Sequence, residues 1–366
     1  MLNRVTNSAS NTVIVDAQQN IAFNAQQLGL DYASWAWRQR AKDSPPGKPP
    51  AVTSLRDNLL ARVAIVFGSL QVLSESTPGL ASWQRYTYRT AADARQLALW
   101  QMDFYRRLAD EHDRIRLIQT REDLDQVRQT WRDETEIDKR VQGLVVKMKG
   151  AEPVAEPKQL EEWLEYGIRV VAPAWYPTRY SASAGVDGGL TLLGYELLDV
   201  MAGYNVLLDI SAMSEPAAAD ALEAYGGAII ASHSNPRYFH DDPRCLSDEQ
   251  IHRIAERDGV IGIMMYNRFL RRDWHPNDRK RQVTASHWVE AVDYVCQLTG
   301  SVAHVGLGSD IDGAYPYHAL PAAIDTSSDL WLLNRALRDG GFSEAEAAEI
   351  LGGNMLRKLE ESLPDG

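Results

Sequence analysis

The sequence is poor in several features that mark particular classes of protein. Its two cysteines, Cys245 and Cys296, have no CxxC spacing, so neither a disulfide framework nor a cysteine-rich metal site is expected. No run approaches the roughly 20 apolar residues that cross a bilayer, and the N-terminal segment 1–8 lacks the apolar stretch of a secretory signal. Acidic residues (50) outnumber basic ones (38), the net charge is −12, and no Lys/Arg block occurs. We therefore expect a cytoplasmic protein with neither a nucleic-acid nor a membrane partner.

The composition fits one enzyme-sized domain. The chain has 366 residues, of which 45% are hydrophobic and 24% charged, enough to bury a large core. No internal repeat or low-complexity domain is evident. We expect a single domain over residues 1–366, with a proline-rich loop at 43–54 that is exposed near the mouth of the fold.

Short β-branched runs alternate with longer helical patterns, which is typical of βα units around a parallel sheet. The expected strands are 13–15, 62–67, 143–148, 169–172, 206–210, 228–232, 260–265 and 302–307. The expected outer helices include 91–112, 192–203, 247–257, 285–298 and 343–351, the last with Ser343 as N-cap and Glu346 three residues later. A further short strand is expected at 115–118. Eight strands predict an α/β protein with a closed (β/α)8, TIM-like barrel.

Residues that directly follow barrel strands are the first candidates for function, because such barrels keep their chemistry at the C-terminal ends of the strands. The candidates at these positions are Gln18, Asn20, Lys149, Trp175, Tyr176, Arg179, Ala212, His233, Arg244, Asp310 and Asp312.

Seven segments of the chain carry a resemblance to a known family. They are 167–169, 188–194, 230–235, 246–249, 259–262, 306–313 and 352–357. Together they resemble the renal (membrane) dipeptidase family of zinc peptidases, peptidase family M19, and its bacterial branch especially. The resemblance runs from Val13 to about Lys358 and implies a metallo-dependent-hydrolase barrel, a peptide-like substrate and a homodimer.

The chain departs from that family where the metal ligands should be. The resemblance implies that active members hold two zinc ions with five ligands: a His, an Asp, a bridging Glu and two further His. The matching positions here carry Gln18, Asn20, Lys149, Ala212 and His233. Because zinc needs several nitrogen, sulfur or carboxylate donors, we expect no cofactor, zinc included. Carbamylation of Lys149 would restore a carboxylate and is an alternative.

Three residues are predicted to carry the chemistry, each with a competing structural role. Lys149 could replace the metals electrostatically, pairing with Asp310 or an anionic ligand; it could instead form a structural ion pair, or act as a base or Schiff-base amine. Without metal, His233 would be a free imidazole, or a hydrogen-bonded structural residue. Asp310 resembles the proton-transferring carboxylate of the family, but Asp310 and Asp312 could also form a turn with Gly313. Lys147 is expected on the same side of the strand as Lys149.

The predicted substrate-binding residues are Gln18, Asn20, Trp175, Tyr176, Arg179, Arg244 and Asp312. Arg244 matches the arginine with which the family contacts the substrate carboxylate. Trp175 stands where animal members have a substrate-contacting His, and Tyr176 could narrow the pocket.

Three functions remain open at this stage. The favoured one is a metal-free enzyme that uses Lys149, His233 and Asp310 for proton transfer on an amino-acid-derived or peptide-like small molecule. The second is an inactive relative that binds a ligand or a partner protein. The third is a conventional zinc dipeptidase. The sequence names neither the substrate nor the reaction.

Overall fold

Eight parallel strands close into a barrel in the computed structural model, which describes residues 12–42, 48–132, 137–313, 315 and 317–366. In barrel order the strands are β2 (Val63–Gln71), β1 (Ile14–Gln19), β11 (Val305–Leu307), β10 (Val260–Ile263), β9 (Ile229–Ala231), β8 (Leu207–Asp209), β7 (Ile168–Ala172) and β6 (Gln142–Lys149). Pairing of β2 with β6, in register from Ile65↔Gly143 to Gln71↔Lys149, closes the ring. The predicted (β/α)8 barrel is confirmed, with every predicted strand present.

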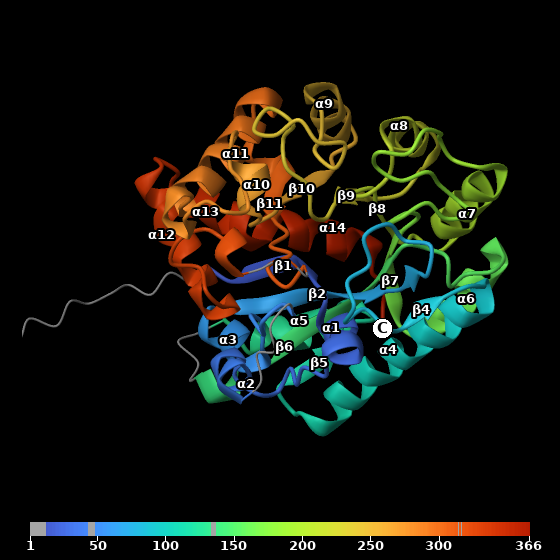
Figure 1. Ribbon diagram of the computed structural model, residues 1–366, viewed down its shortest axis with the longest axis horizontal. Coiled ribbons are helices and arrows are strands. Elements are labelled where there is room, and N and C mark those ends of the chain that lie inside the picture. Colours follow the sequence, from blue (N-terminus) through green and yellow to red (C-terminus); the bar gives the residue numbers. More distant parts are fainter. Residues whose placement is uncertain (1–11, 43–47, 133–136, 314, 316) are drawn as a thin grey trace, which may run out of the picture.

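Helices surround the barrel, as Figure 1 shows for α4, α6 to α9, α11 and α12. The helices are α1 (Ile21–Leu28), α2 (Ala36–Lys42), α3 (Leu55–Leu60), α4 (Ala91–Glu111), α5 (Arg121–Gln129), α6 (Leu160–Glu165), α7 (Leu192–Gly203), α8 (Glu215–Ala224), α9 (Asp248–Glu256), α10 (Asn267–Leu270), α11 (Ala285–Thr299), α12 (Leu332–Asp339), α13 (Glu344–Ala348) and α14 (Asn354–Ser362). Ser343 and Glu346 form the predicted capping box at the start of α13.

Smaller elements complete the fold. The predicted extra strand is β5 (Ile115–Leu117), which pairs with the start of β6. Two short strands, β3 (Leu73–Ser74) and β4 (Thr87–Tyr88), form a separate sheet. Residues 302–304, predicted as strand, form a 3-10 turn that leads into β11. Both cysteines are free and buried. No helix among the described residues is long and apolar enough to cross a membrane.

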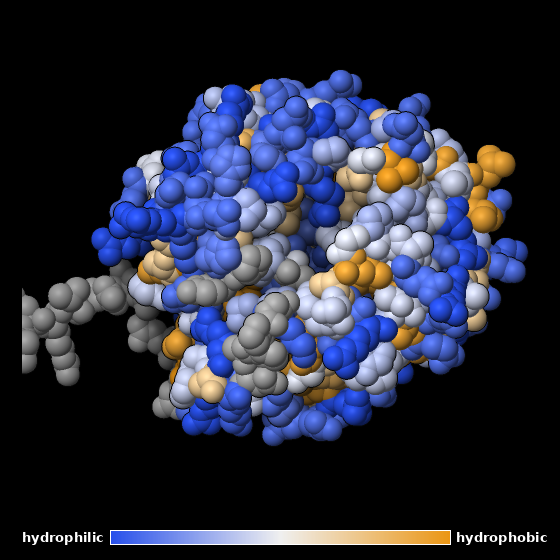
Figure 2. All heavy atoms as spheres, in the orientation of Figure 1, coloured by the Kyte–Doolittle hydropathy of each residue, from blue (hydrophilic) through white to orange (hydrophobic). Residues whose placement is uncertain are grey.

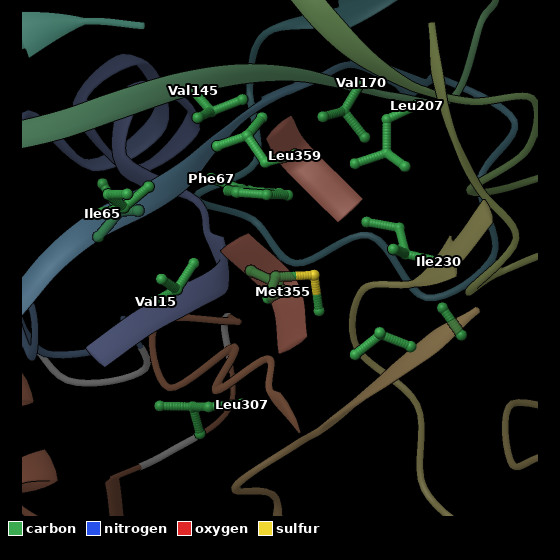
Figure 3. Close-up of a cluster of buried hydrophobic side chains, with 14 of the residues drawn as sticks. Val15, Ile65, Phe67, Val145, Val170, Leu207, Ile230, Leu307, Met355 and Leu359 are labelled. Atoms are coloured by element: carbon green, nitrogen blue, oxygen red, sulfur yellow. The ribbon is translucent and has the colours of Figure 1, made fainter. Parts of the chain in front are cut away.

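Apolar side chains fill the part of the barrel interior that lies next to α14 (Figure 3). Val145, Leu207 and Ile230 of the strands meet Met355 and Leu359 of α14 there, and all five side chains are buried. The turn before α14 lies close to the start of β1, since a Cβ on Gly352 would be 2.6 Å from the carbonyl oxygen of Val13. The C-terminal helix therefore covers the N-terminal end of the barrel, and the functional residues must lie at the opposite end.

The two-residue period of the strands turns this apolar layer into a polar one. On β6, Lys147 and Lys149 follow Val145 on the same side. On β8 Asp209 follows Leu207, and after β9 Ser232 follows Ile230, and all of these polar side chains are buried. Both lysines therefore point into the barrel, one layer above the other.

The proline-rich loop is only partly described, because residues 43–47 lie outside the described residues. Residues 48–54 form neither helix nor strand, as predicted. The prediction that the whole loop is exposed is wrong for its second half, since Ala51, Val52 and Ser54 are buried. The Thr53 hydroxyl lies 3.3 Å from Asp312 Oδ2, which brings the loop to the barrel mouth.

Candidate functional site

A buried amide and carboxylate network lies at the C-terminal ends of β1 and β11. Asn20 Nδ2 donates to Asp310 Oδ1 at 2.7 Å and to Asp312 Oδ1 at 3.2 Å, and the backbone N–H of Asn20 donates to both oxygens of Asp312 at 2.9 Å. Gln18 Nε2 donates to Asn20 Oδ1 at 2.9 Å. Asp310 has a left-handed backbone (φ 45), which Asp tolerates better than most residues, and its N–H donates to the Gln18 carbonyl. The sequence-predicted residues of β1 and β11 are therefore brought into direct contact.

Asp312 is held mainly by the protein itself. Besides Asn20, its carboxylate accepts from the side chains of Asn24 and Thr53, and Gly313 N–H donates to the Asp310 carbonyl in the predicted turn. Burial raises the pKa of Asp312 to about 7, because the hydrogen bonds from Asn20 only partly offset the desolvation of its charge. These contacts fasten the loop after β11 to β1.

Lys149 lies at the centre of the barrel mouth. Its Nζ donates to Asn20 Oδ1 at 3.2 Å, lies 3.7 Å from Asp310 Oδ1 and stands 3.7 Å from the centre of the Trp175 ring. The predicted pairing of Lys149 with Asp310 is thus present. Burial lowers the pKa of Lys149 to about 8, with the Asp310 carboxylate opposing the shift. A lysine with such a pKa can exchange its proton near neutral pH.

A second buried ion pair lies one layer below. Lys147 Nζ contacts Asp209 Oδ2 at 3.0 Å and Ser232 Oγ at 2.6 Å, and both charged side chains are fully buried. Asp209 also accepts hydrogen bonds from the side chain and N–H of Ser211 and from Ser232. Burial alone would raise the pKa of Asp209, but the Lys147 ammonium and these hydrogen bonds outweigh it and hold the pKa below its usual value.

His233 links the two layers. Its Nδ1 lies 2.7 Å from Ser232 Oγ, its backbone N–H donates to Ser211 Oγ, and its Nε2 has no hydrogen-bond partner among the described residues. Burial, together with the charges of Lys149, Lys147 and Arg244, holds the pKa of His233 well below its usual value. The imidazole is therefore neutral at physiological pH.

Trp175 joins the cationic side of the site. The Arg244 guanidinium carbon lies 4.2 Å from the centre of its ring, and the His233 ring lies 5.8 Å away at an interplanar angle of 27°. Trp175 Nε1 and Arg244 Nε are buried atoms without a hydrogen-bond partner among the described residues. With Lys149 and Arg244 against Asp310, this part of the mouth favours an anionic ligand group. Figure 2 shows a recess near the middle of the face in view, bordered by hydrophilic residues.

Two of the predicted binding residues lie at the edge of this network, beside a neighbouring groove. Arg179 is held by Glu152 at 2.7 Å and by the Ala155 carbonyl. Tyr176 packs beside the buried cluster of Phe23, Leu73 and Trp83. Both residues line a separate groove of about 600 Å³ that also includes Ser74, Pro78 and Val186. Arg179 therefore faces this groove, whereas Tyr176 lies between the groove and the site, because its ring also packs edge-on against Trp175 at a centroid distance of 6.0 Å.

Comparison with known proteins identifies the relatives of this fold and site. A sequence model of the membrane dipeptidase family (peptidase family M19) matches residues 46–363. The chain belongs to the membrane dipeptidase family. A protein of Klebsiella pneumoniae, uncharacterized and encoded in the 5′ region of pqqA, is 30% identical over 215 residues, which cover 56% of this chain and 76% of that protein. An uncharacterized dipeptidase of Schizosaccharomyces pombe is 29% identical over 206 residues, 55% of this chain and 48% of that protein.

Solved structures of dipeptidase-family proteins share the fold. A metallopeptidase from Rhodobacter sphaeroides, liganded with a phosphinate mimic of the dipeptide L-Ala-D-Ala, has a TM-score of 0.78 at 21% identity, covering 96% of this chain and 99% of that one. The probable dipeptidase PvdM from Pseudomonas aeruginosa has a TM-score of 0.74 at 18% identity, covering 96% of this chain and 95% of that one.

The five positions that the resemblance matches to the family's zinc ligands do not form a donor set for zinc. Gln18 and Asn20 offer neutral amides, Ala212 offers no donor, and Lys149 brings an ammonium. Among the described residues, no group of three or more His, Cys, Asp or Glu side chains is arranged to hold a metal ion. Since divalent cations require several anionic or imidazole ligands, these side chains do not fit a dinuclear centre.

The sequence missed the lower layer of the site. The sequence places Lys147 on the side of Lys149 but does not single out its partner Asp209 or the neighbouring Ser211 and Ser232. The alternation along 206–210 carries the signal, because Asp209 is two residues beyond the inward-facing Leu207. The hydrogen bond from Ser69 Oγ to Asn20 Oδ1 was also missed.

Proposed function

We propose that this membrane dipeptidase relative is a metal-independent enzyme for an amino-acid-derived or peptide-like small molecule. Lys149, His233 and Asp310 would transfer protons at the barrel mouth. The observation that carries the proposal is the buried Lys149 ammonium, which contacts both Asn20 and Asp310 where the family has a metal-bridging carboxylate. A fixed positive charge in a site of low dielectric stabilises developing negative charge on a bound ligand.

Each of the three residues has a distinct role in this proposal. Lys149 donates a hydrogen bond to the polarised oxygen of the ligand and can give up its proton. Asp310, held by Asn20 and Lys149, takes or returns a proton. His233, neutral and open at Nε2, accepts or delivers a proton on the other side. Arg244 and Trp175 would receive the carboxylate of the ligand, as the resemblance implies for the arginine.

A catalytically inactive binding protein is the second candidate. The favouring observation is that Lys149 and Asp310 already contact each other, while the Asp312 oxygens are occupied by Asn20, Asn24 and Thr53. A site closed on itself in this way can bind a ligand without turning it over. The dipeptidase names among the relatives also favour ordinary zinc-dependent hydrolysis, which the same experiment distinguishes.

The experiment combines metal content with turnover. The purified protein is assayed by elemental analysis and against dipeptides, acyl amino acids and cyclic amides, with and without a chelator. Turnover that survives the chelator, is lost in Lys149→Ala and Asp310→Asn, and persists in the exposed control Lys158→Ala supports a metal-free enzyme. About two zinc ions per chain with chelator-sensitive turnover would refute it. Binding without turnover would favour the inactive relative.

A further inference from the structure

The orientation of the Asn20 amide is fixed by its neighbours. The Lys149 ammonium only donates hydrogen bonds, so the end of the Asn20 amide that faces it at 3.2 Å must be the oxygen, which also accepts from Ser69 Oγ at 3.0 Å. The amide nitrogen then faces the carboxyl groups of Asp310 and Asp312, at 2.7 and 3.2 Å. Reversing the amide would place its N–H groups against the Lys149 ammonium.

The Asn20 orientation in turn fixes Gln18. The group of Gln18 that faces Asn20 Oδ1 at 2.9 Å must be a donor, hence its amide nitrogen. Gln18 Oε1 is left as an acceptor, completely buried and without a hydrogen-bond partner among the described residues. A buried amide oxygen without a partner is destabilising, because no hydrogen bond offsets the loss of its hydration. The chain therefore keeps an acceptor at the barrel mouth that nothing in its described part satisfies.

The same counting fixes the tautomer of His233. Ser232 has one hydroxyl hydrogen, and its Oγ is 2.6 Å from both the Asp209 carboxylate and the Lys147 ammonium. The hydrogen goes to the carboxylate, and the oxygen accepts from Lys147. Ser232 can then only accept from His233, so the imidazole proton lies on Nδ1. The unpartnered Nε2 of His233 therefore carries a lone pair.

These two unsatisfied acceptors belong to side chains that both lie beside Lys149. Gln18 Nε2 and Lys149 Nζ both donate to Asn20 Oδ1, at 2.9 and 3.2 Å. Lys149 Nζ and the His233 ring both lie against the Trp175 ring, 3.7 and 5.8 Å from its centre. Lys149 and Arg244 add positive charge nearby, since both lie against Trp175. These cations would repel an ammonium group or a metal cation, whereas they would not repel a neutral N–H group.

We propose that Gln18 Oε1 and His233 Nε2 each accept one hydrogen of a neutral NH2 group of the ligand, such as a primary amide or terminal ureido nitrogen. This deepens the proposed function, from which it takes only the peptide-like nature of the ligand. Lys147, Asp209 and Ser232 are then positioning residues, because they keep the lone pair of His233 available. The N–H donor occupies a level of the barrel where the family resemblance would lead one to expect metal.

The test uses ¹⁵N-histidine-labelled protein of known metal content and small matched probes. The His233 resonances are assigned with a His233→Asn variant, and the ¹⁵N shifts of the free protein report which ring nitrogen carries the proton. Acetamide, N-methylacetamide and N,N-dimethylacetamide are then titrated, since they differ in N–H count. Methylammonium is the cationic control.

The expected result is an Nδ1–H tautomer and an acetamide-induced shift of His233 Nε2. Two hydrogen bonds of about 0.7 kcal/mol each make acetamide bind roughly tenfold more tightly than N,N-dimethylacetamide, with N-methylacetamide between them. Methylammonium should bind more weakly than acetamide. In Gln18→Leu the preference for acetamide should shrink about threefold, and Gln18→Met provides a second variant if the first is unstable.

Several results would overturn the proposal. One is an Nε2–H tautomer, or a metal bound to Nε2, in the free protein. Another is an equal response of His233 to all three amides, or no response to any of them. A third is a preference for acetamide that persists unchanged in both Gln18 variants, because such a preference would reflect exclusion of the larger amides by size. None of these measurements uses turnover. Loss of the proposed enzyme activity and loss of the proposed N–H site are therefore detected separately.

Discussion

Breaking the buried Lys147–Asp209 pair should destabilise the protein far more than breaking a surface pair. Both side chains are completely buried and lie 3.0 Å apart. In Lys147→Met or Asp209→Asn one buried charge remains without its partner. The free energy of unfolding should therefore fall by about 3–5 kcal/mol, the usual cost of such a change. The matched control is Asp339→Asn, which breaks the Arg335–Asp339 pair, whose side chains are 79% and 71% exposed, and should cost about 0–1 kcal/mol.

The double variant Lys147→Met/Asp209→Asn makes the reasoning sharper. It removes both charges, so its cost should fall well below the sum of the two single costs. The measurement is urea unfolding followed by tryptophan fluorescence and by circular dichroism, with coincidence of the two curves as the check for a two-state transition. Strict additivity, or a single substitution costing under about 1 kcal/mol, would refute the view that the pair is held as one electrostatic unit.

Three further predictions concern charge, packing and backbone contact. Burial raises the pKa of Asp312 to about 7, so the folded state binds the Asp312 proton more tightly than the unfolded state, and the stability from this group is lost as pH rises from about 4 to 7. Asp312→Asn should reduce this loss, measured as the urea midpoint across the same pH range. Met355→Ala should cost roughly 2–5 kcal/mol in the same assay, because Met355 is buried at the barrel floor, and a cost near zero would contradict its place there. Gly352→Ala should destabilise the protein by roughly 1–3 kcal/mol, because the new Cβ would lie 2.6 Å from the Val13 carbonyl oxygen. The control Gly226→Ala, whose Cβ would have no atom within 4 Å, should be close to neutral, and equal effects of the two substitutions would refute the close approach.

The fold could be predicted from sequence because its signals are local. Each barrel strand is a short β-branched run, and the helices carry caps such as Ser343 and Thr90, so pattern and position agree along the chain. Boundaries were less predictable where tertiary contacts decide them. The turn at 302–304 reads as strand from its composition, yet the carbonyls of Val302 and Val305 are bound by Asn354 from the distant C-terminal helix.

The site could be predicted in part, because strand ends are visible in the sequence whereas partners across the barrel are not. Gln18, Asn20, Lys149, His233, Asp310 and Asp312 were predictable as residues that follow strands. Their hydrogen-bond partners were not, since Asn20 and Asp310 are 290 residues apart in sequence. Arg179 also follows a strand, but its ion pair with Glu152 holds it at a neighbouring groove. Position after a strand is thus a useful sign of the site, but it neither finds every residue of the site nor excludes residues outside it.

Asn20 and Lys149 depend on each other electrostatically. Asn20 donates to Asp310 and Asp312 through one end of its amide and accepts from Lys149 through the other. An aspartate at position 20 would place a third carboxylate within hydrogen-bond distance of the other two, and only the backbone N–H of residue 20 would remain to donate to Asp312. A glutamate at position 149 would face the Asn20 oxygen and Asp310 with like polarity. Either family-like residue alone would be destabilising in this surrounding, so the amide and the ammonium are kept as a pair, and the site has its own stable arrangement rather than that of a metal centre with ligands removed.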